Sequence, residues 1–344
     1  MSHFAGVDAA STSTQGVLNH PENPAGPMAN TVLGPVPAAE LGVTAVHESL
    51  LSVVPGAEHA PDIRIDRAEI FDILAAKLTG FREHGGGTLV DSTGMFHGRD
   101  LSLYEALSRA TGVHIIASTG MGPEEMLGGY FLTPQTNPPT PWPADRFAGL
   151  FSKEVAEGMV VPRIERRAAA GLVATAAARA GITPTEESLF RGAARTSLAT
   201  GVPVSIRFGA DAVAELDLVL AEGLPADRVL VGGLDRRDCT AEAALDLAER
   251  GAFVGIDHAG SADGGYLDDE SRAALVLKLV EAGHAERIIL SVNAIGVAKG
   301  QPDYDLPYSY VLSTFMPLLQ AKGLGDRDAR RILADNPQAL LSVR

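Results

Sequence analysis

Short apolar runs alternate with amphipathic segments from about residue 40 onward, and this alternation constrains the fold more than any other feature. The runs are rich in β-branched residues, and each leads into Gly, Ser, Thr, Asp or Asn, as buried parallel strands do. They cover residues 43–49, 87–93, 113–119, 171–175, 202–208, 228–234, 252–258 and 287–293. Several helical patterns between them end in Gly, which stops a helix in the left-handed conformation. Eight strands joined by crossover helices predict an α/β fold, the (β/α)8 TIM barrel.

The competing architecture is an open, doubly wound sheet. It would place a Gly-rich phosphate-binding turn after the first strand, whereas the Gly-containing segment GPVPAAELG precedes that strand. We therefore expect residues 31–344 to form a single barrel domain. Residues 1–30 are rich in Ser, Thr, Ala, Pro, Asn and Gly without hydrophobic periodicity, which predicts a disordered or extended N-terminal arm.

Charge and cysteine content restrict the partners. The chain has 28 Lys and Arg against 43 Asp and Glu, a net charge of −15, which argues against nucleic acid or an anionic membrane as a partner. Its single cysteine, Cys239, excludes an intramolecular disulfide and suits a reducing compartment. With no secretory signal pattern and no apolar stretch of about 18 residues, we expect a cytoplasmic protein that binds a small molecule.

The residues that end the predicted strands are the candidates for a site, because barrel active sites lie at the C-terminal ends of the strands. Strand alternation points His47 and Ser49 into the barrel and Glu48 toward the helices, where it would be a structural partner. The other strand-end candidates are Asp91 to Thr93, Ser118, Thr119, Ala174, Thr175, Arg207, Gly233, Asp235, Asp257, His258 and Asn293.

Several segments resemble the phosphotriesterase family of the amidohydrolase superfamily. They include TVLGPVPAAELGVTAVHES, GRDLSLYEALSRATGVHIIASTG, RVLVGGLD, GAFVGIDH and the terminal NPQALLS, and the likeness extends over residues 31–343. The resemblance implies a TIM barrel, a hydrolase ancestry and a homodimer. It also implies a two-metal centre held by an H-x-H pair, a lysine, two histidines and an aspartate.

Five of the six implied ligand positions hold side chains that are not the family's metal ligands. The six positions are occupied by His47, Ser49, Ala174, Arg207, Gly233 and Ala294, so one ligand of six is kept. A divalent cation needs three or four suitable donors, and Arg207 adds a permanent positive charge to the same cavity. We therefore predict that the family's metal centre is absent and that the chain uses no cofactor.

Arg207 is predicted to bind a carboxylate or phosphate through two parallel hydrogen bonds. The alternative is that Arg207 pairs with Asp235 or Asp257 and fills the emptied cavity. His258, supported by Asp257, is predicted to act as a general acid or base, with His47 as a second proton-transfer group; the alternative for either histidine is a structural role.

Further candidates for contact with a substrate are Ser49, Asp235, Asn293, Tyr130 and Tyr308. The two tyrosines lie in loops after the third and eighth strands, where packing is the alternative role.

Three functional hypotheses remain open. The leading one is a metal-independent enzyme that acts on a small anionic or carbonyl-bearing molecule by hydrolysis or by a lyase or isomerase step. The second is a non-catalytic binding pseudoenzyme. The third is a zinc-dependent ester or lactone hydrolase with a rearranged site that uses His47, Asp91, Asp257 or His258.

Overall fold

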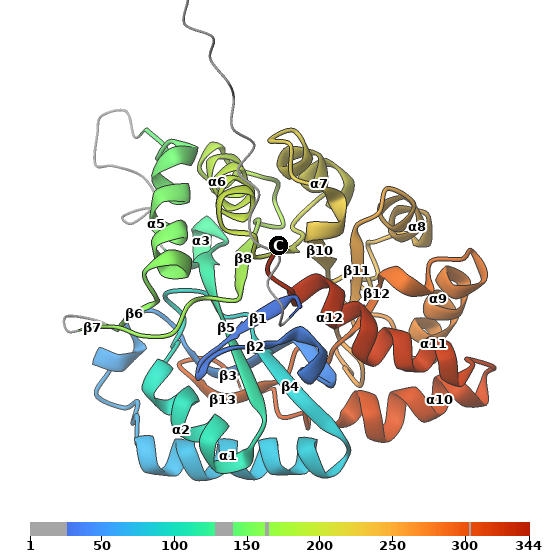
Figure 1. Ribbon diagram of the computed structural model, residues 1–344, viewed down its shortest axis with the longest axis horizontal. Coiled ribbons are helices and arrows are strands. Elements are labelled where there is room, and N and C mark those ends of the chain that lie inside the picture. Colours follow the sequence, from blue (N-terminus) through green and yellow to red (C-terminus); the bar gives the residue numbers. More distant parts are fainter. Residues whose placement is uncertain (1–25, 128–139, 162–164, 303) are drawn as a thin grey trace, which may run out of the picture.

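The computed structural model describes residues 26–127, 140–161, 165–302 and 304–344. Its main sheet has nine parallel strands in the order β12-β11-β10-β9-β8-β5-β4-β3-β13, and helices surround this sheet (Figure 1). The bounds are β3 (Val43–Val53), β4 (Gly86–Asp91), β5 (His114–Met121), β8 (Leu172–Ala176), β9 (Val204–Arg207), β10 (Val229–Gly232), β11 (Phe253–Ile256), β12 (Ile288–Leu290) and β13 (Ile295–Lys299).

The sheet closes into a barrel through the eighth strand. β12 and β13 are consecutive pieces of chain at opposite ends of the strand order, and β13 pairs with β3 in parallel. The short stretch between them also bonds to β3, because the His47 N–H donates to Ser291 Oγ at 3.0 Å and the Ser49 N–H donates to the Ala294 carbonyl at 2.9 Å. All eight predicted strands are present, and the predicted TIM barrel is confirmed.

Helices lie between successive strands of the barrel, as a crossover topology requires, and three more follow the last strand. They are α1 (Arg67–Glu83), α2 (Leu101–Thr111), α3 (Glu124–Leu127), α5 (Ala144–Ala156), α6 (Pro184–Thr200), α7 (Ala212–Leu220), α8 (Ala241–Glu249), α9 (Asp269–Glu281), α10 (Met316–Ala321), α11 (Asp326–Arg330) and α12 (Asn336–Leu341). π-helical turns at Val311–Phe315 and Arg331–Asp335 lead into α10 and α12. Single 3₁₀ turns cover Ala38–Glu40, Ala57–His59, Ala226–Arg228 and Ala285–Arg287.

Local sequence signals set the helix ends. Thr183 caps α6 in a capping box with Glu186, which satisfies backbone N–H groups that a helix start leaves free. Gly112 and Gly201 end α2 and α6 with φ of 68° and 77°, the left-handed conformation expected from sequence.

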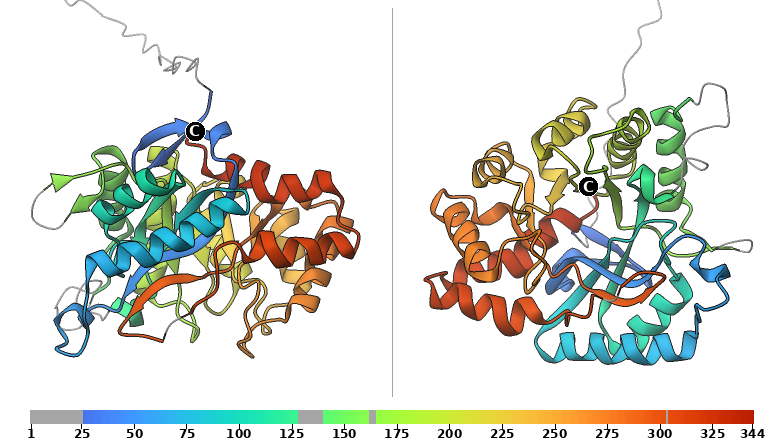
Figure 2. Two further views of the ribbon diagram at one scale, coloured as in Figure 1. Left: turned by 90° about the horizontal axis from the view of Figure 1, so that it is seen from below. Right: turned by 180° about the vertical axis from the view of Figure 1, so that it is seen from behind.

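A small hairpin covers the N-terminal end of the barrel. It consists of β1 (Met28–Thr31) and β2 (Gly34–Pro37), and Ala29 packs there with inward residues of the barrel strands such as Val46 and Leu230. Figure 2 shows the hairpin beside the C-terminus, where Met28 bridges to Val343. Residues 28–30, which are predicted to belong to the arm, are part of β1. Residues 1–25 of the predicted arm lie outside the described part of the chain.

A second hairpin, β6 (Val160–Val161) and β7 (Glu165–Arg166), follows α5 on the outside of the barrel. Among the described residues, no helix is both long and apolar enough to cross a lipid bilayer.

Candidate functional site

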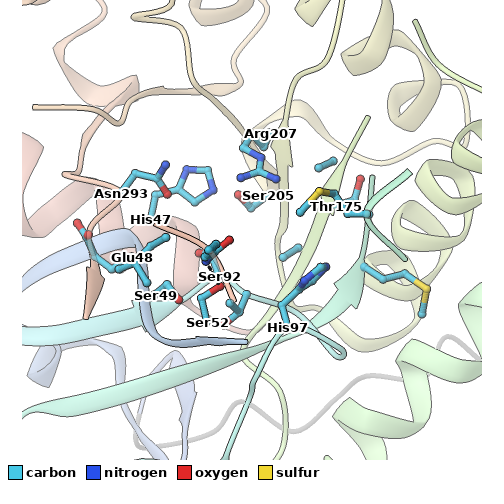
Figure 3. A pocket seen from close by; sticks show the side chains of 18 residues that line it. His47, Glu48, Ser49, Ser52, Ser92, His97, Thr175, Ser205, Arg207 and Asn293 are labelled. Carbon is cyan, nitrogen blue, oxygen red and sulfur yellow. Dashed lines mark hydrogen bonds between the residues drawn. The ribbon is translucent and has the colours of Figure 1, made fainter. Parts of the chain in front are cut away.

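A pocket of about 170 Å³ lies at the C-terminal ends of the strands. Four of the predicted catalytic and substrate-binding residues line it, namely His47, Ser49, Arg207 and Asn293. The strand-end candidates Ser92, Thr93, Ala174 and Thr175 line it too. Figure 3 shows that His47 and Arg207 converge on the same space from different strands, with His97 on the far side of the pocket. The strand-end rule therefore predicts the end of the barrel at which this pocket lies.

The strand register explains which side chains enter the pocket. Ala174 on β8 pairs with Ser205 on β9, and Ala176 pairs with Arg207. Arg207 in turn pairs with Gly232 on β10. Because directly paired residues of parallel strands point to the same face, the small side chains beside Arg207 leave room for its guanidinium inside the barrel mouth.

His47 forms a pair with Asp257 across the barrel. Its Nδ1 lies 2.8 Å from Asp257 Oδ2, which also accepts the Gly233 N–H at 2.6 Å. Both side chains are almost fully buried, yet His47 lines the pocket. A carboxylate accepts, so Nδ1 donates to it, and Nε2 is the nitrogen left to act in the pocket.

Two glycines make room for this pair. A Cβ at Gly232 would lie 2.3 Å from Asp257 Oδ2 and 2.5 Å from His47 Cε1. A Cβ at Gly255 would lie 2.7 Å from Asp257 Oδ1. The imidazole of His47 therefore reaches across the barrel from β3 to the inner face of β10, a position that only glycine permits there.

The expectation that Asp257 supports His258 is corrected. His258 Nδ1 lies 2.8 Å from Asp235 Oδ1, and its Nε2 lies 3.2 Å from Asn293 Nδ2. Its ring stacks on Tyr266 with the ring centroids 3.7 Å apart. Consecutive residues at the end of a strand face opposite ways, so Asp257 and His258 take different partners. With both ring nitrogens engaged, His258 lies behind Asn293 and outside the pocket lining.

Two predicted substrate contacts are also corrected. Asp235 has no exposed surface, and it accepts hydrogen bonds from the His258 N–H at 3.0 Å and from Arg272 Nε at 2.6 Å. Burial opposes its ionisation, but the hydrogen bonds and charges of His258 and Arg272 hold the pKa of Asp235 below its usual value. Tyr308 is buried behind β3 and donates to the Ser49 carbonyl at 2.7 Å. Tyr130 lies outside the described residues.

Arg207 is exposed to the pocket and makes no hydrogen bond or ion pair with any described residue. The two carboxylates considered as its partners are engaged elsewhere, Asp257 with His47 and Asp235 with Arg272. Burial, and secondly the charge of Arg207, lower the pKa of the nearby His97. The pocket therefore contains a guanidinium that makes no ion pair with a described residue, although the charge of Asp257 acts on it.

Three hydroxyl groups of the lining also lack partners. Ser49 Oγ, Thr175 Oγ1 and Ser205 Oγ are enclosed and have no hydrogen-bond partner within the described ranges. More than nine in ten buried polar groups in native proteins are paired, so three exceptions in one pocket call for an explanation.

Two buried carboxyl groups connect β3 to the chain on either side of it: Glu48 to the stretch before β13, and Asp91 from β4. Glu48 accepts the Val292 N–H at 2.9 Å and the Ala294 N–H at 2.7 Å, and burial raises its pKa to about 8. Asp91 accepts the Leu50 N–H at 2.7 Å and the Tyr104 hydroxyl at 3.0 Å. Glu48 thus has the structural role expected from sequence, although it also borders the pocket.

The residues present do not fit a two-metal centre. Among the described residues, no three His, Cys, Asp or Glu side chains converge on one point. His47 gives one nitrogen to Asp257, and the unpaired Arg207 stands where the family resemblance implies a histidine ligand. Of the four residues suggested for a rearranged zinc site, only His47 and Asp257 are in contact, whereas Asp91 bonds to Tyr104 and His258 bonds to Asp235.

Sequence reasoning missed several lining residues, chiefly His97 and Ser205. Ser205 was predictable, since it lies two residues before Arg207 on the same strand and shares its face. His97 sits in the loop between β4 and α2, where no periodicity says which side chain turns inward.

The closed parallel barrel defines a (β/α)8-barrel protein. Its polar pocket lies at the C-terminal ends of the strands, where barrel enzymes have their active sites. The model of the phosphotriesterase family matches residues 27–341, and the chain belongs to this family.

Its relatives are distant but extend over nearly the whole chain. A phosphotriesterase homology protein of Escherichia coli is 26% identical, with 86% of this chain and 96% of that protein aligned. An aryldialkylphosphatase of Saccharolobus solfataricus is 25% identical, with 89% and 97% aligned. An N-acetyltaurine hydrolase of Salmo salar is 23% identical, with 91% and 97% aligned. Among solved structures, a mutant of a phosphotriesterase-like lactonase from Deinococcus radiodurans has a TM-score of 0.78 at 24% identity, covering 91% of this chain and all of that one.

Proposed function

We propose that this chain is an enzyme that binds a small anionic or carbonyl-bearing molecule at Arg207 and moves protons through His47, without the family's two-metal centre. The observation that carries this proposal is the Arg207 guanidinium, unpaired within the described part of the chain, in the same pocket as the His47–Asp257 pair. In a chain of net charge −15, a cation that is left unpaired in a pocket is suited to an anionic ligand.

Each residue has a distinct task in this scheme. Arg207 binds a carboxylate or phosphate through two parallel hydrogen bonds, or polarises a carbonyl oxygen. Asp257 keeps the proton on His47 Nδ1, so that Nε2 takes a proton from water or substrate and returns it to the product. Imidazole exchanges protons near neutral pH, which suits both halves of the cycle.

His258 enters the proposal as a positioning residue. Its contact with Asn293 Nδ2 holds the amide at the edge of the pocket and leaves the Asn293 carbonyl oxygen for a substrate. Proton transfer by His47 is compatible with ester or lactone hydrolysis and with a lyase or isomerase step. The experiment must therefore also identify the reaction class.

The test is turnover by protein that has been exhaustively chelated. The substrate panel takes its classes from the names of the relatives: lactones, aryl dialkyl phosphates and N-acetyltaurine, with simple carboxylate esters added. We expect turnover of at least one class after chelation and a loss of roughly 10²-fold or more in His47→Asn. His59→Asn is the matched control, because His59 is exposed and lies outside the pocket lining.

Turnover that disappears on chelation and returns with zinc would overturn the proposal. Anion binding that depends on Arg207, with no turnover on any substrate, would assign the second candidate function, a non-catalytic binding protein. The replacement of five of the six metal-ligand positions favours that candidate next.

A further inference from the structure

Hydroxyl side chains make up an unusual share of the pocket wall. Six of them line it: Ser49, Ser52, Ser92, Thr93, Thr175 and Ser205. They come from β3, β8 and β9 and from the loop after β4, so they face the pocket from several sides. Such a wall offers both donors and acceptors, and it suits a ligand that can do the same.

Three of these hydroxyls are already engaged within the protein. Ser52 Oγ accepts from Gln301 Nε2 at 2.7 Å, Ser92 Oγ donates to the Val46 carbonyl at 3.1 Å, and Thr93 Oγ1 bonds to Asp91.

The other three hydroxyls are the buried groups without partners. The exposed fractions of Ser49, Thr175 and Ser205 are 8%, 4% and 1%. Leaving such groups unmatched when a ligand fills the pocket costs free energy, whereas a ligand with its own hydroxyl groups can pair with them. An apolar substrate would therefore be rejected by this wall.

The position of Arg207 orients such a ligand. Ser205 and Arg207 are two residues apart on β9 and share its inward face, so they are separated by about 6.5 Å along the strand. An acid group held by Arg207 at the mouth places the rest of a short carbon chain deeper, along Ser205 and the facing hydroxyls.

We infer that the ligand of this pocket is a small polyhydroxylated acid, with its acid group on Arg207 and its hydroxyl groups on Ser49, Thr175 and Ser205. This inference rests on the proposed function and narrows the substrate class from any small anion. It predicts selection against alkyl acids, which carry the same charge, and against polyols, which carry the same hydroxyl groups.

Titration calorimetry with matched ligands tests the inference. One set is D-gluconate, hexanoate and sorbitol, which have the same number of carbons; a smaller set is D-glycerate, propionate and glycerol. We expect at least one hydroxy acid to bind about tenfold or more tightly than its alkyl and polyol counterparts. Thr175→Val and Ser205→Ala should each reduce that preference several-fold and leave alkyl-acid affinity unchanged. Thr79→Val is the control, since Thr79 is exposed on α1.

The other possible outcomes would overturn either this inference alone or both the inference and the proposed function. Alkyl acids that bind as tightly as hydroxy acids, and lose affinity in Arg207→Met, would overturn this inference and leave the proposed function standing. If polyols bind as tightly as hydroxy acids, the acid group does not contribute to binding, and the inferred contact of that group with Arg207 is wrong. If no acid binds, or if Arg207→Met binds acids as well as the wild type, both the inference and the proposed function fail.

Discussion

Gly232→Ala probes the His47–Asp257 pair without changing either residue. The added Cβ would lie 2.3 Å from Asp257 Oδ2, 2.5 Å from His47 Cε1 and 2.7 Å from His47 Nδ1, which real Cβ atoms do not tolerate. Both side chains are buried and cannot swing into solvent, so the imidazole or the carboxylate must shift. The substitution should therefore weaken the 2.8 Å contact that holds the imidazole.

The expected cost follows from packing. Inserting a methyl group into a filled interior typically costs about 1–3 kcal/mol, and a weakened hydrogen bond to a carboxylate adds to that. We expect the free energy of unfolding to fall by about 2 kcal/mol in urea titrations, together with a change in the ¹⁵N imidazole signals of His47. If Gly232 had no such neighbours, its replacement by alanine within the strand would instead stabilise the protein.

Gly264→Ala is the matched control, because no atom lies within 4 Å of the Cβ it would add. It should leave both stability and the His47 signals unchanged. If Gly232→Ala behaves like this control, the imidazole of His47 does not rest on β10, and the proposed proton-transfer pair is wrong.

Three further predictions concern stability. Asp235→Asn removes one of the two carboxylates that pair with the fully buried Arg272, the other being Asp269, and should lower the unfolding free energy by about 2–3 kcal/mol in urea titration; a loss below about 1 kcal/mol would contradict the structural role assigned to Asp235. Thr175→Val removes an unpaired buried hydroxyl and should raise the unfolding free energy by about 1 kcal/mol, whereas a decrease would mean that the hydroxyl has a partner within the protein. Glu48 has its pKa raised from 4.5 to about 8, so its contribution to stability is complete below pH 4.5 and is lost as the pH rises through 8. Denaturation from pH 5 to 9 should therefore show a steeper loss in the wild type than in Glu48→Gln, and parallel profiles would refute a neutral buried Glu48.

The fold was predictable because its signals are local. Each strand appears as a short β-branched run, and the rule that barrel sites lie at strand ends is enough to place His47, Ser49, Arg207 and Asn293 in one pocket. The alternation of side chains along a strand also accounts for Ser205, which lies two residues before Arg207 on β9.

The pairing of the buried charges was not predictable in the same way. Asp257 and His258 are neighbours in sequence, which suggested that they act together. Their partners, His47 and Asp235, lie 210 and 23 positions away from them and are chosen by the register of the barrel. Gly232 and Gly255 leave space for the His47–Asp257 pair. The sequence alone does not show which distant side chain fills the space beside a glycine in a strand.

Anion binding by chelated protein, measured by titration calorimetry with and without added zinc, tests the central claim most directly. We expect that a small hydroxy acid binds the metal-free protein, that zinc leaves the affinity unchanged, and that Arg207→Met abolishes binding. Binding that requires zinc, or that survives in Arg207→Met, would contradict the claim that Arg207 anchors the ligand without a metal centre.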